Sequence, residues 1–536
     1  EITTRLVGSE MCIRDSHMIV EVSNLKLGGS MNDKKIIIIG GGISGLTAGI
    51  YAQKAGFSSE IYERHSIVGG ECTGWDRDGY HIDNCIHWLM GTTKGTELNR
   101  IWRETGAIDD DTEIIRNDKM YTSEFDGKSI SLWKDINKTK EELLALSPED
   151  ADEINKLIES CIVGAKVNIP AEKPPEMMNF IDVIKLSKSM KILKLYEGMD
   201  TNDLMDKFKH PLIKCLISDF CPKESLANSF PMAYGNFISG DGGIPKGGSR
   251  AMALRMRKRY EELGGRIFTD CNVMKIDVDE DIATGITLKD GRKVKGDYII
   301  PACDINYTFG HLLGKDYMDD VMNEVLHHRK KYPIYGMFQA AYAIDSHKAL
   351  ESEYMLDASD IKNESWMGDR ITVKTYGYEP DFAPKGKQII QILWGLSEDS
   401  YIYWRKLYGD REQYNKKKVE IAELILRKIE ERFPEYAGKM KLIDTWTPIT
   451  YERYCNAYKG YNQAYMITKN SMKNPYPSPF VKGIENVILA GQWLSPPGGL
   501  PGAAIQGKFS IQRILKKEKR LSLIHISEPT RRVVIS

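Results

Sequence analysis

The sequence lacks the features that mark several large classes of protein. Its 74 lysines and arginines balance 75 aspartates and glutamates, which gives a formal net charge of −1. Without a basic excess, we expect no nucleic-acid partner. No apolar run is nearly as long as a membrane-spanning helix, which needs about 20 residues. The nine cysteines contain no CxxC pair and no zinc-type spacing, so we expect no metal site and a reducing, cytoplasmic setting.

The two ends of the chain do not read like the rest of it. Residues 6–15 and 522–531 can be encoded by the two strands of one DNA sequence, read in different frames. This relation is typical of a sequencing-library adapter that has been translated. We therefore expect residues 1–17 and 521–536 not to be native. The natural chain is expected to run from Met31 to about Arg520, with Met18 as the alternative start.

A glycine cluster follows a run of four isoleucines and precedes an apolar helical pattern. Gly40 is expected to make the turn, Gly42 to let the backbone approach a pyrophosphate, and Gly45 to let the helix pack closely on the strand. The helix would begin at Ile43 and Ser44, where free N–H groups can face phosphates. This order of strand, turn and helix predicts a dinucleotide site.

An acidic residue closes the next short strand. Glu63 follows the glycines by about twenty residues, the spacing at which an acid accepts hydrogen bonds from adenosine ribose hydroxyls. Arg64, directly after it, is a further candidate contact of the nucleotide. The alternative interpretation is a glycine-rich turn that holds no ligand.

Further glycines extend this pattern into a family motif. Gly69 and Gly70 complete an ExxxxxGG pattern that begins at Glu63, and a GYxxD pattern ends at Asp83. This combination resembles the FAD-binding amine oxidase and phytoene desaturase superfamily. The resemblance implies that the two glycines approach the pyrophosphate of FAD and that the segment after Asp83 passes beside the flavin ring. The group often has arginine where this chain has Glu71, so no role is carried over to that side chain.

Two later segments resemble the same group. Residues 244–302 look like the middle FAD-domain segment of phytoene desaturases, in which the backbone at Val273 meets the adenine. Residues 486–507 contain PxGxxPGA, which resembles the C-terminal flavin motif of these enzymes, although many relatives have an acid where Gln492 stands. The cofactor contacts that this second resemblance implies are Gly491, Gln492, Pro501, Gly502 and Ala503.

These motifs predict an α/β fold with two domains. One is a Rossmann-like FAD-binding domain whose parallel sheet lies in a three-layer ββα packing, and the other is an inserted α+β substrate domain with an antiparallel sheet. The FAD-binding domain is expected at 31–110, 240–315 and 470–520, and the substrate domain at 111–239 and 316–469. Many aromatic residues lie in the second range. They predict either an apolar pocket or an ordinary core.

A basic amphipathic stretch covers residues 177–199. Lysines recur there among apolar residues at helical spacing. One interpretation is a helix that rests on a membrane surface and collects a lipid-soluble substrate. The other is a solvated helix whose apolar face packs on its own domain.

Together the three segments resemble the phytoene desaturase, carotenoid isomerase and retinol saturase group, and the pattern from Asp83 to Trp88 is closer to that of retinol saturases than to that of a classical phytoene desaturase. The resemblance implies an FAD-dependent oxidoreductase that moves a hydride between flavin and a carbon of an apolar polyene or isoprenoid substrate. The direction (desaturation, saturation or isomerisation) stays open. So does the electron donor or acceptor, because the sequence has no second GxGxxG.

His87 is the candidate catalytic acid or base beside the flavin. The alternative is a histidine that is hydrogen-bonded for structural reasons. For the whole protein, the alternatives are an amine oxidase-type flavoenzyme and a non-catalytic flavin-binding protein.

Overall fold

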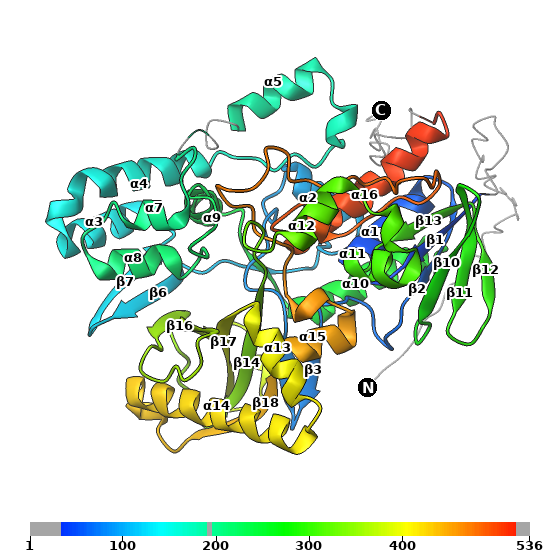
Figure 1. The fold of residues 1–536 in the computed structure, drawn as a ribbon. Coiled ribbons are helices and arrows are strands. Elements are labelled where there is room, and N and C mark those ends of the chain that lie inside the picture. Colours follow the sequence, from blue (N-terminus) through cyan, green and yellow to red (C-terminus); the bar gives the residue numbers. More distant parts are fainter. Residues whose placement is uncertain (1–33, 190–193, 195, 521–536) are drawn as a thin grey trace, which may run out of the picture.

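The computed structural model describes residues 34–189, 194 and 196–520. The expected adapter segments, both candidate start residues, and residues 190–193 and 195 of the basic amphipathic stretch lie outside the described residues. The described chain forms an α/β region, a large sheet and a helical region that meet at the centre of the molecule (Figure 1).

A four-stranded parallel sheet forms the core of the α/β region. Its strands, in spatial order, are β13 (Tyr298–Pro301), β1 (Lys35–Ile39), β2 (Ser58–Tyr62) and β9 (Arg266–Phe268). Ile36 and Ile38 of β1 pack against helices, whereas Ile37 and Ile39 pack on the opposite side of the sheet. The unbroken apolar run follows from this arrangement, because a parallel sheet covered on both faces has no polar face.

Helices and a smaller sheet cover the two faces. The helices are α1 (Ile43–Lys54), α10 (Gly248–Glu262) and α16 (Gly499–Lys517). The smaller antiparallel sheet contains β10 (Val273–Asp279), β11 (Ile282–Leu288) and β12 (Lys293–Lys295). In α16, a Cβ added at Gly507 would lie 2.4 Å from the carbonyl oxygen of Ser44, so the glycine lets α16 approach α1 closely. The predicted Rossmann-like, three-layer packing is confirmed.

A seven-stranded sheet forms the second region. Its strands, in spatial order, are β18 (Met440–Trp446), β14 (Tyr335–Ile344), β17 (Gln388–Ser397), β16 (Met367–Thr375), β15 (Tyr354–Asp357), β6 (Lys119–Phe125) and β7 (Lys128–Trp133). The pairings are antiparallel except for β15 with β6. One face packs on α13 (Asp399–Leu407) and α14 (Arg411–Arg432), with Phe338 and Trp394 buried between them. The predicted antiparallel sheet is therefore confirmed, and these two aromatic residues belong to its core.

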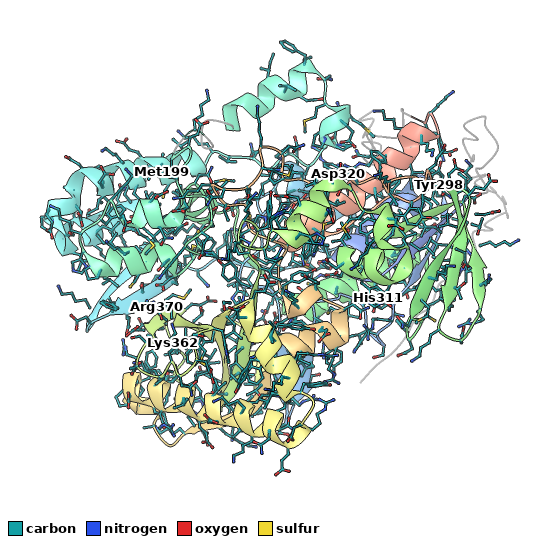
Figure 2. The ribbon with its side chains drawn as sticks, in the orientation of Figure 1. Met199, Tyr298, His311, Asp320, Lys362 and Arg370 are labelled. Carbon is teal, nitrogen blue, oxygen red and sulfur yellow. The ribbon has the colours of Figure 1, made fainter. Side chains whose placement is uncertain are left out.

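The helical region packs against β6 and β7. Its helices are α3 (Ile136–Leu146), α4 (Ala151–Gly164), α7 (Thr201–Met205), α8 (Pro211–Ser218) and α9 (Ser229–Ile238). Arg370 of β16 reaches the end of α8 and forms a bidentate ion pair with the buried Asp219, with N–O distances of 2.6 and 2.9 Å. This contact lies where the helical region meets the large sheet (Figure 2).

Shorter elements connect the three regions. They are α2 (Glu97–Glu104), α5 (Phe180–Ser189), α11 (Ile305–Tyr307), α12 (Asp320–His327), α15 (Pro448–Cys455) and the strand pairs β3 (Gly74–Arg77) with β4 (Tyr80–Asp83) and β5 (Ile114–Ile115) with β8 (Ile244–Pro245). No helix within the described ranges combines the length and the apolar character needed to cross a bilayer. The residue bounds of the two domains stay a prediction.

Candidate functional site

The turn from β1 into α1 has the geometry of an anion site. Gly40 has φ of +104°, a conformation that favours glycine. A Cβ at Gly45 would lie 2.0 Å from the carbonyl oxygen of Gly40, so only glycine permits this close packing of the helix on the turn. Gly42 caps α1 without any side-chain hydrogen bond to the first turn. The first N–H groups of the helix are thus not used by a capping side chain and can bind an anion.

Glu63 lies beside this turn and is almost fully buried. Its two carboxyl oxygens accept hydrogen bonds from the backbone N–H groups of Gly41 and His65, at 2.7 and 2.8 Å. Burial raises the pKa of the Glu63 carboxyl, and these two hydrogen bonds oppose the shift. Each oxygen keeps a further lone pair that can accept from a ligand hydroxyl.

The second pair of glycines lies against the first turn. The N–H of Gly69 donates to the carbonyl of Gly41 at 2.9 Å, and Gly69 and Gly42 form a parallel bridge. Gly69 and Gly70 have φ of +113° and +60°. A Cβ at Gly69 would meet the carbonyl oxygen of Cys72 at 2.3 Å. Two glycine turns that are separated in the sequence therefore form one surface of exposed backbone.

The C-terminal segment approaches the same place from the other side of β13. Ala490 donates from its N–H to the carbonyl of Pro301 at 3.0 Å, and the chain then turns at Gly491, which has φ of +118°. The side-chain oxygen of Gln492 accepts a hydrogen bond of 2.9 Å from the N–H of Gly499. Gln492 therefore closes the loop that leads into α16.

These turns surround a cavity of about 500 Å³, here called the first cavity. The predicted cofactor residues that line it are Gly40, Gly42, Ile43, Ser44, Glu63, Arg64, Gly69, Gly70, Val273, Gly491, Gln492 and Ala503. Gly45 lies behind the lining, and Pro501 and Gly502 line a different cavity. The hydroxyls of Ser44 and Thr73 are buried at this wall and have no hydrogen-bond partner in the part of the chain that the structure describes.

A larger, mostly apolar cavity of about 1830 Å³ lies next to the first one and is here called the second cavity. The large sheet contributes Gln339, Met355, Thr372 and Leu393 to its wall. His87 also lines this cavity but does not line the first. Burial lowers the pKa of the His87 ring well below its ordinary value, and the positive charge of Lys374 adds to the shift. Both effects favour the neutral form of the imidazole.

Asp83 fixes the segment that passes between the two cavities. Its carboxylate accepts hydrogen bonds from the N–H and the hydroxyl of Ser249 in α10, at 2.5 and 2.6 Å. It also accepts from the N–H of Cys85 at 3.1 Å. The following residues, Cys85 to His87, are thereby held at the cavity walls.

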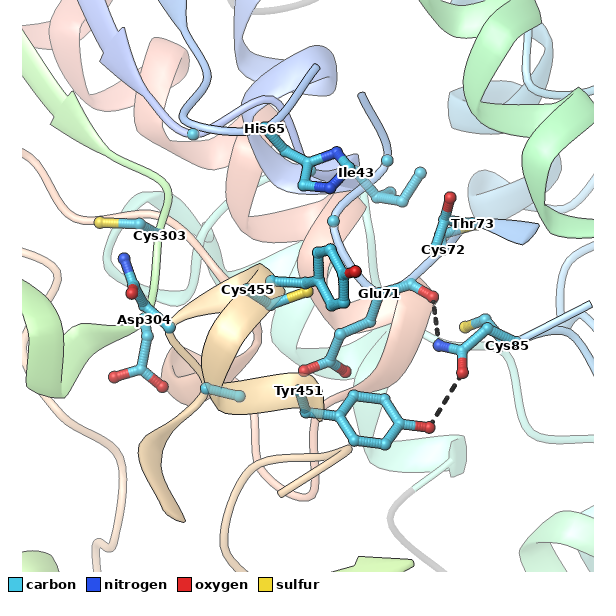
Figure 3. Close-up of a pocket in the computed structure, with 18 of the residues that line it drawn as sticks. Ile43, His65, Glu71, Cys72, Thr73, Cys85, Cys303, Asp304, Tyr451 and Cys455 are labelled. Carbon is cyan, nitrogen blue, oxygen red and sulfur yellow. Dashed lines mark hydrogen bonds between the residues drawn. The ribbon is translucent and has the colours of Figure 1, made fainter. Parts of the chain in front are cut away.

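The two cavities share part of their lining. The residues that belong to both are Glu71, Asn84, Cys85, Tyr451, Asn462, Gly499 and Leu500. Figure 3 shows Glu71 with its carboxyl group between Cys455 and Tyr451. Sequence reasoning did not select Glu71 or Tyr451, because nothing local indicates that segments almost 400 residues apart meet here. We call this shared wall the junction.

Comparisons with known proteins agree with this architecture. A family model described as an NAD(P)-binding Rossmann-like domain matches residues 38–105. The chain is 24% identical over 514 residues to a chloroplastic prolycopene isomerase of Daucus carota, covering 91% of this chain and 80% of that protein. It is 21% identical over 522 residues to a lycopene-forming phytoene desaturase of Paracoccus sp., covering 90% and 97% of the two chains. The predicted resemblance to the phytoene desaturase and carotenoid isomerase group is confirmed.

A solved structure supports the fold. Cyclohexylamine oxidase from Brevibacterium oxydans superposes with a TM-score of 0.57 at 14% identity, covering 91% of this chain and all of that one. At this identity the likeness concerns the fold alone.

Proposed function

We propose that the chain is an FAD-dependent oxidoreductase that transfers a hydride between flavin and a carbon–carbon bond of an apolar polyene or isoprenoid substrate. The observation that carries this proposal is the junction, where a glycine-lined nucleotide-type cavity opens beside a larger apolar one. A large cavity whose exposed wall is mostly apolar suits a hydrocarbon ligand. The relatives named for carotenoid isomerisation and desaturation support the same substrate class.

The residues of the first cavity fit FAD. Glu63 can accept from the ribose hydroxyls, and the first turn of α1 and the unpartnered Ser44 hydroxyl can bind phosphate oxygens. At the start of α16, Gln492 binds the N–H of Gly499 and Pro501 has no N–H, so the N–H of Leu500, which lines the same cavity, can bind the carbonyl edge of the ring. When bound, FAD supplies the two-electron chemistry, and the protein holds and orients the reactants.

An apolar substrate would have to reach the second cavity from its surroundings. The cavity wall includes Pro175 and Glu176, and α5 begins shortly after them. Phe180, Ile181 and Val183 of α5 are 79%, 63% and 52% exposed, so the described residues leave these apolar side chains largely uncovered. Figure 1 shows α5 standing away from the body of the molecule. We propose that α5 rests on a lipid surface and that substrate enters from there.

The flavin proposal is tested by purifying the protein, recording its visible spectrum, and titrating it with FAD. We expect flavin absorbance bands that remain after gel filtration. Under anaerobic conditions, phytoene or lycopene in detergent should change the redox state of the flavin in the oxidised or the reduced protein. A preparation that stays colourless with added FAD would contradict the proposal. Flavin reduction by cyclohexylamine or putrescine, with no response to polyenes, would instead support the amine oxidase alternative.

Replacing Phe180, Ile181 and Val183 together by serine should weaken binding to vesicles of phosphatidylcholine and phosphatidylglycerol. Each apolar side chain that enters the lipid contributes about 1 to 2 kcal/mol, so the partition coefficient should fall by about a hundredfold or more. Vesicle co-sedimentation measures this. Ile402→Ser, which removes another exposed apolar side chain at a distance from α5, is the control. Equal binding of the triple variant and the control would show that α5 does not contact lipid.

A further inference from the structure

Glu71 is the acidic residue at the junction of the two cavities. Its side chain lines both, whereas Glu63 and Asp304 line only the first and Glu353 lines only the second. A group at this wall can touch a substrate carbon in the second cavity while lying next to the cofactor in the first.

The backbone of Glu71 is held rigidly. Its carbonyl oxygen accepts from the N–H of Thr73 and from the side-chain amide of Asn84, both at 2.9 Å. The Asn84 oxygen in turn accepts from Trp446 and from the hydroxyl of Tyr451, both at 3.0 Å. The dashed lines in Figure 3 mark the two Asn84 contacts that link Glu71 to Tyr451. The large sheet therefore fixes the position of Glu71 through Asn84.

The carboxyl group of Glu71, by contrast, has no fixed partner. Within the described ranges, no hydrogen bond and no ion pair reaches its oxygens. The titratable groups that face it are all acidic or weakly acidic and come from several elements: Cys85, Asp304, Tyr451, Cys455 and Tyr461.

Asp304 provides an instructive contrast. Its carboxylate accepts hydrogen bonds from the N–H groups of Asn306, Tyr307 and Tyr458 and from the hydroxyl of Tyr461. Burial raises the pKa of the Asp304 carboxyl as well, but these four donors oppose the shift. No donor of the described residues opposes the shift at Glu71, so of the two neighbouring carboxyl groups Glu71 is the one suited to exchange a proton.

We propose that Glu71 is a catalytic residue that gives a proton to, or takes one from, the substrate carbon next to the carbon that exchanges hydride. This inference rests on the proposed function. In saturation, the carbon–carbon double bond would open, Glu71 would give its carboxyl proton to one carbon, and the neighbouring carbon would take a hydride with its electron pair, which bound, reduced FAD would supply. Glu71 becomes a carboxylate and is reprotonated by water. In desaturation the same bonds form and break in reverse, so the carboxylate takes the proton.

The surroundings of the Glu71 carboxyl set the pH dependence of the proposed proton transfer. Burial raises the pKa of the Glu71 carboxyl well above its usual range, and Cys85 and Asp304 add to the shift. The protonated form is therefore present at pH values at which an exposed glutamate is ionised. Saturation requires that form, so its rate is full below the folded-state pKa and falls as pH rises through it. Desaturation requires the carboxylate and has the opposite profile.

The variant Glu71→Gln tests the proposal, because it keeps the shape of the side chain and removes its exchangeable acid. General acid or base catalysis accelerates a reaction by about 10² to 10⁴-fold, so the turnover rate of phytoene or lycopene should fall by about a hundredfold or more. The rate should also lose the part of its pH dependence that reports the Glu71 carboxyl. Glu71→Asp keeps the acid on a shorter side chain and should recover part of the rate with a shifted pH dependence. Glu104→Gln removes a mostly buried carboxyl that accepts a hydrogen bond from Tyr51 and lines neither cavity, and it is the matched control.

Infrared difference spectroscopy gives a readout that does not depend on turnover. In wild-type protein, with or without FAD, we expect a protonated carboxyl band that shifts in D₂O, fades as pH rises, and is missing from Glu71→Gln but kept in Glu104→Gln. Absence of that band from the wild-type protein overturns the inference. So does a Glu71→Gln variant whose turnover and pH dependence equal those of the wild type. Failure of FAD to bind would contradict the proposed function. The carboxyl band of the FAD-free protein would still show whether Glu71 is protonated.

Discussion

Replacing Gly42 by valine should give a folded protein that no longer binds FAD. Gly42 has φ of −71° and ψ of 179°, which valine adopts without strain. The nearest atoms to an added Cβ are the carbonyl oxygen of Gly69 at 3.9 Å and the Cα of Gly70 at 4.0 Å, so the protein itself leaves room. The added side chain would occupy the wall on which the pyrophosphate is expected to lie. We expect FAD affinity to fall by about a hundredfold or more, which is about 3 kcal/mol.

The neighbouring glycine provides the contrasting variant. In Gly45→Ala the new Cβ would clash with the carbonyl oxygen of Gly40 at 2.0 Å, so this variant should lose stability as well as cofactor. FAD titration followed by fluorescence, together with thermal unfolding of the FAD-free proteins, separates the two effects. Wild-type FAD affinity in folded Gly42→Val would show that the cofactor does not lie on this turn.

Narrowing the second cavity should strongly lower polyene turnover while FAD binding persists. Gly395 on β17 lines this cavity, and an added Cβ would have no heavy atom within 4 Å. Its neighbour Trp394 points to the opposite, packed face of the sheet, so the side chain of Gly395→Phe should enter the cavity. The ring would occupy volume that a long polyene needs. We expect kcat/KM for lycopene or phytoene to fall by about a hundredfold or more.

Two controls test whether the loss of activity depends on the size of the added side chain and of the substrate. Gly395→Ala adds one methyl group and should lose much less activity, and a shorter isoprenoid should be affected less than a long one by Gly395→Phe. The flavin spectrum should be that of wild type in both variants. An unchanged kcat/KM in Gly395→Phe, with FAD bound, would place the substrate elsewhere.

The parts of the site that sequence predicts are those in which the backbone dictates the residue type. Gly40 needs a positive φ, and Gly45 and Gly69 lie where a Cβ would clash. Such requirements are local, so they appear as glycines at fixed spacing. The four isoleucines of β1 show burial on both faces in the same way.

Helical periodicity explains where the expected lining diverges from the structure. Gly499, Leu500 and Ala503 share one side of α16 and line the first cavity, because residues three and four apart lie on one helix face. Pro501 and Gly502 fall between them in sequence and line the second cavity instead. A sequence motif gives the order of the residues but does not show which side of the helix each residue faces.

Long-range contacts and surface exposure could not be predicted. Glu71 lies at the junction because Tyr451, on the connecting helix α15, closes the wall beside it. The apolar pattern of α5 predicts a buried face as readily as an exposed one, and only the fold shows that Phe180 and Ile181 are uncovered.

The close packing of α16 on α1 has a consequence for biosynthesis. The helix that follows the first glycine turn is covered by a helix that begins at Gly499, and Gly507 brings the two backbones into contact. The N-terminal turn leaves the ribosome long before the wall formed by Gly491 and Ala503 does. Because the first cavity takes its walls from both segments, it is complete only once the chain has been made as far as α16. We expect a dinucleotide to be enclosed only after that point.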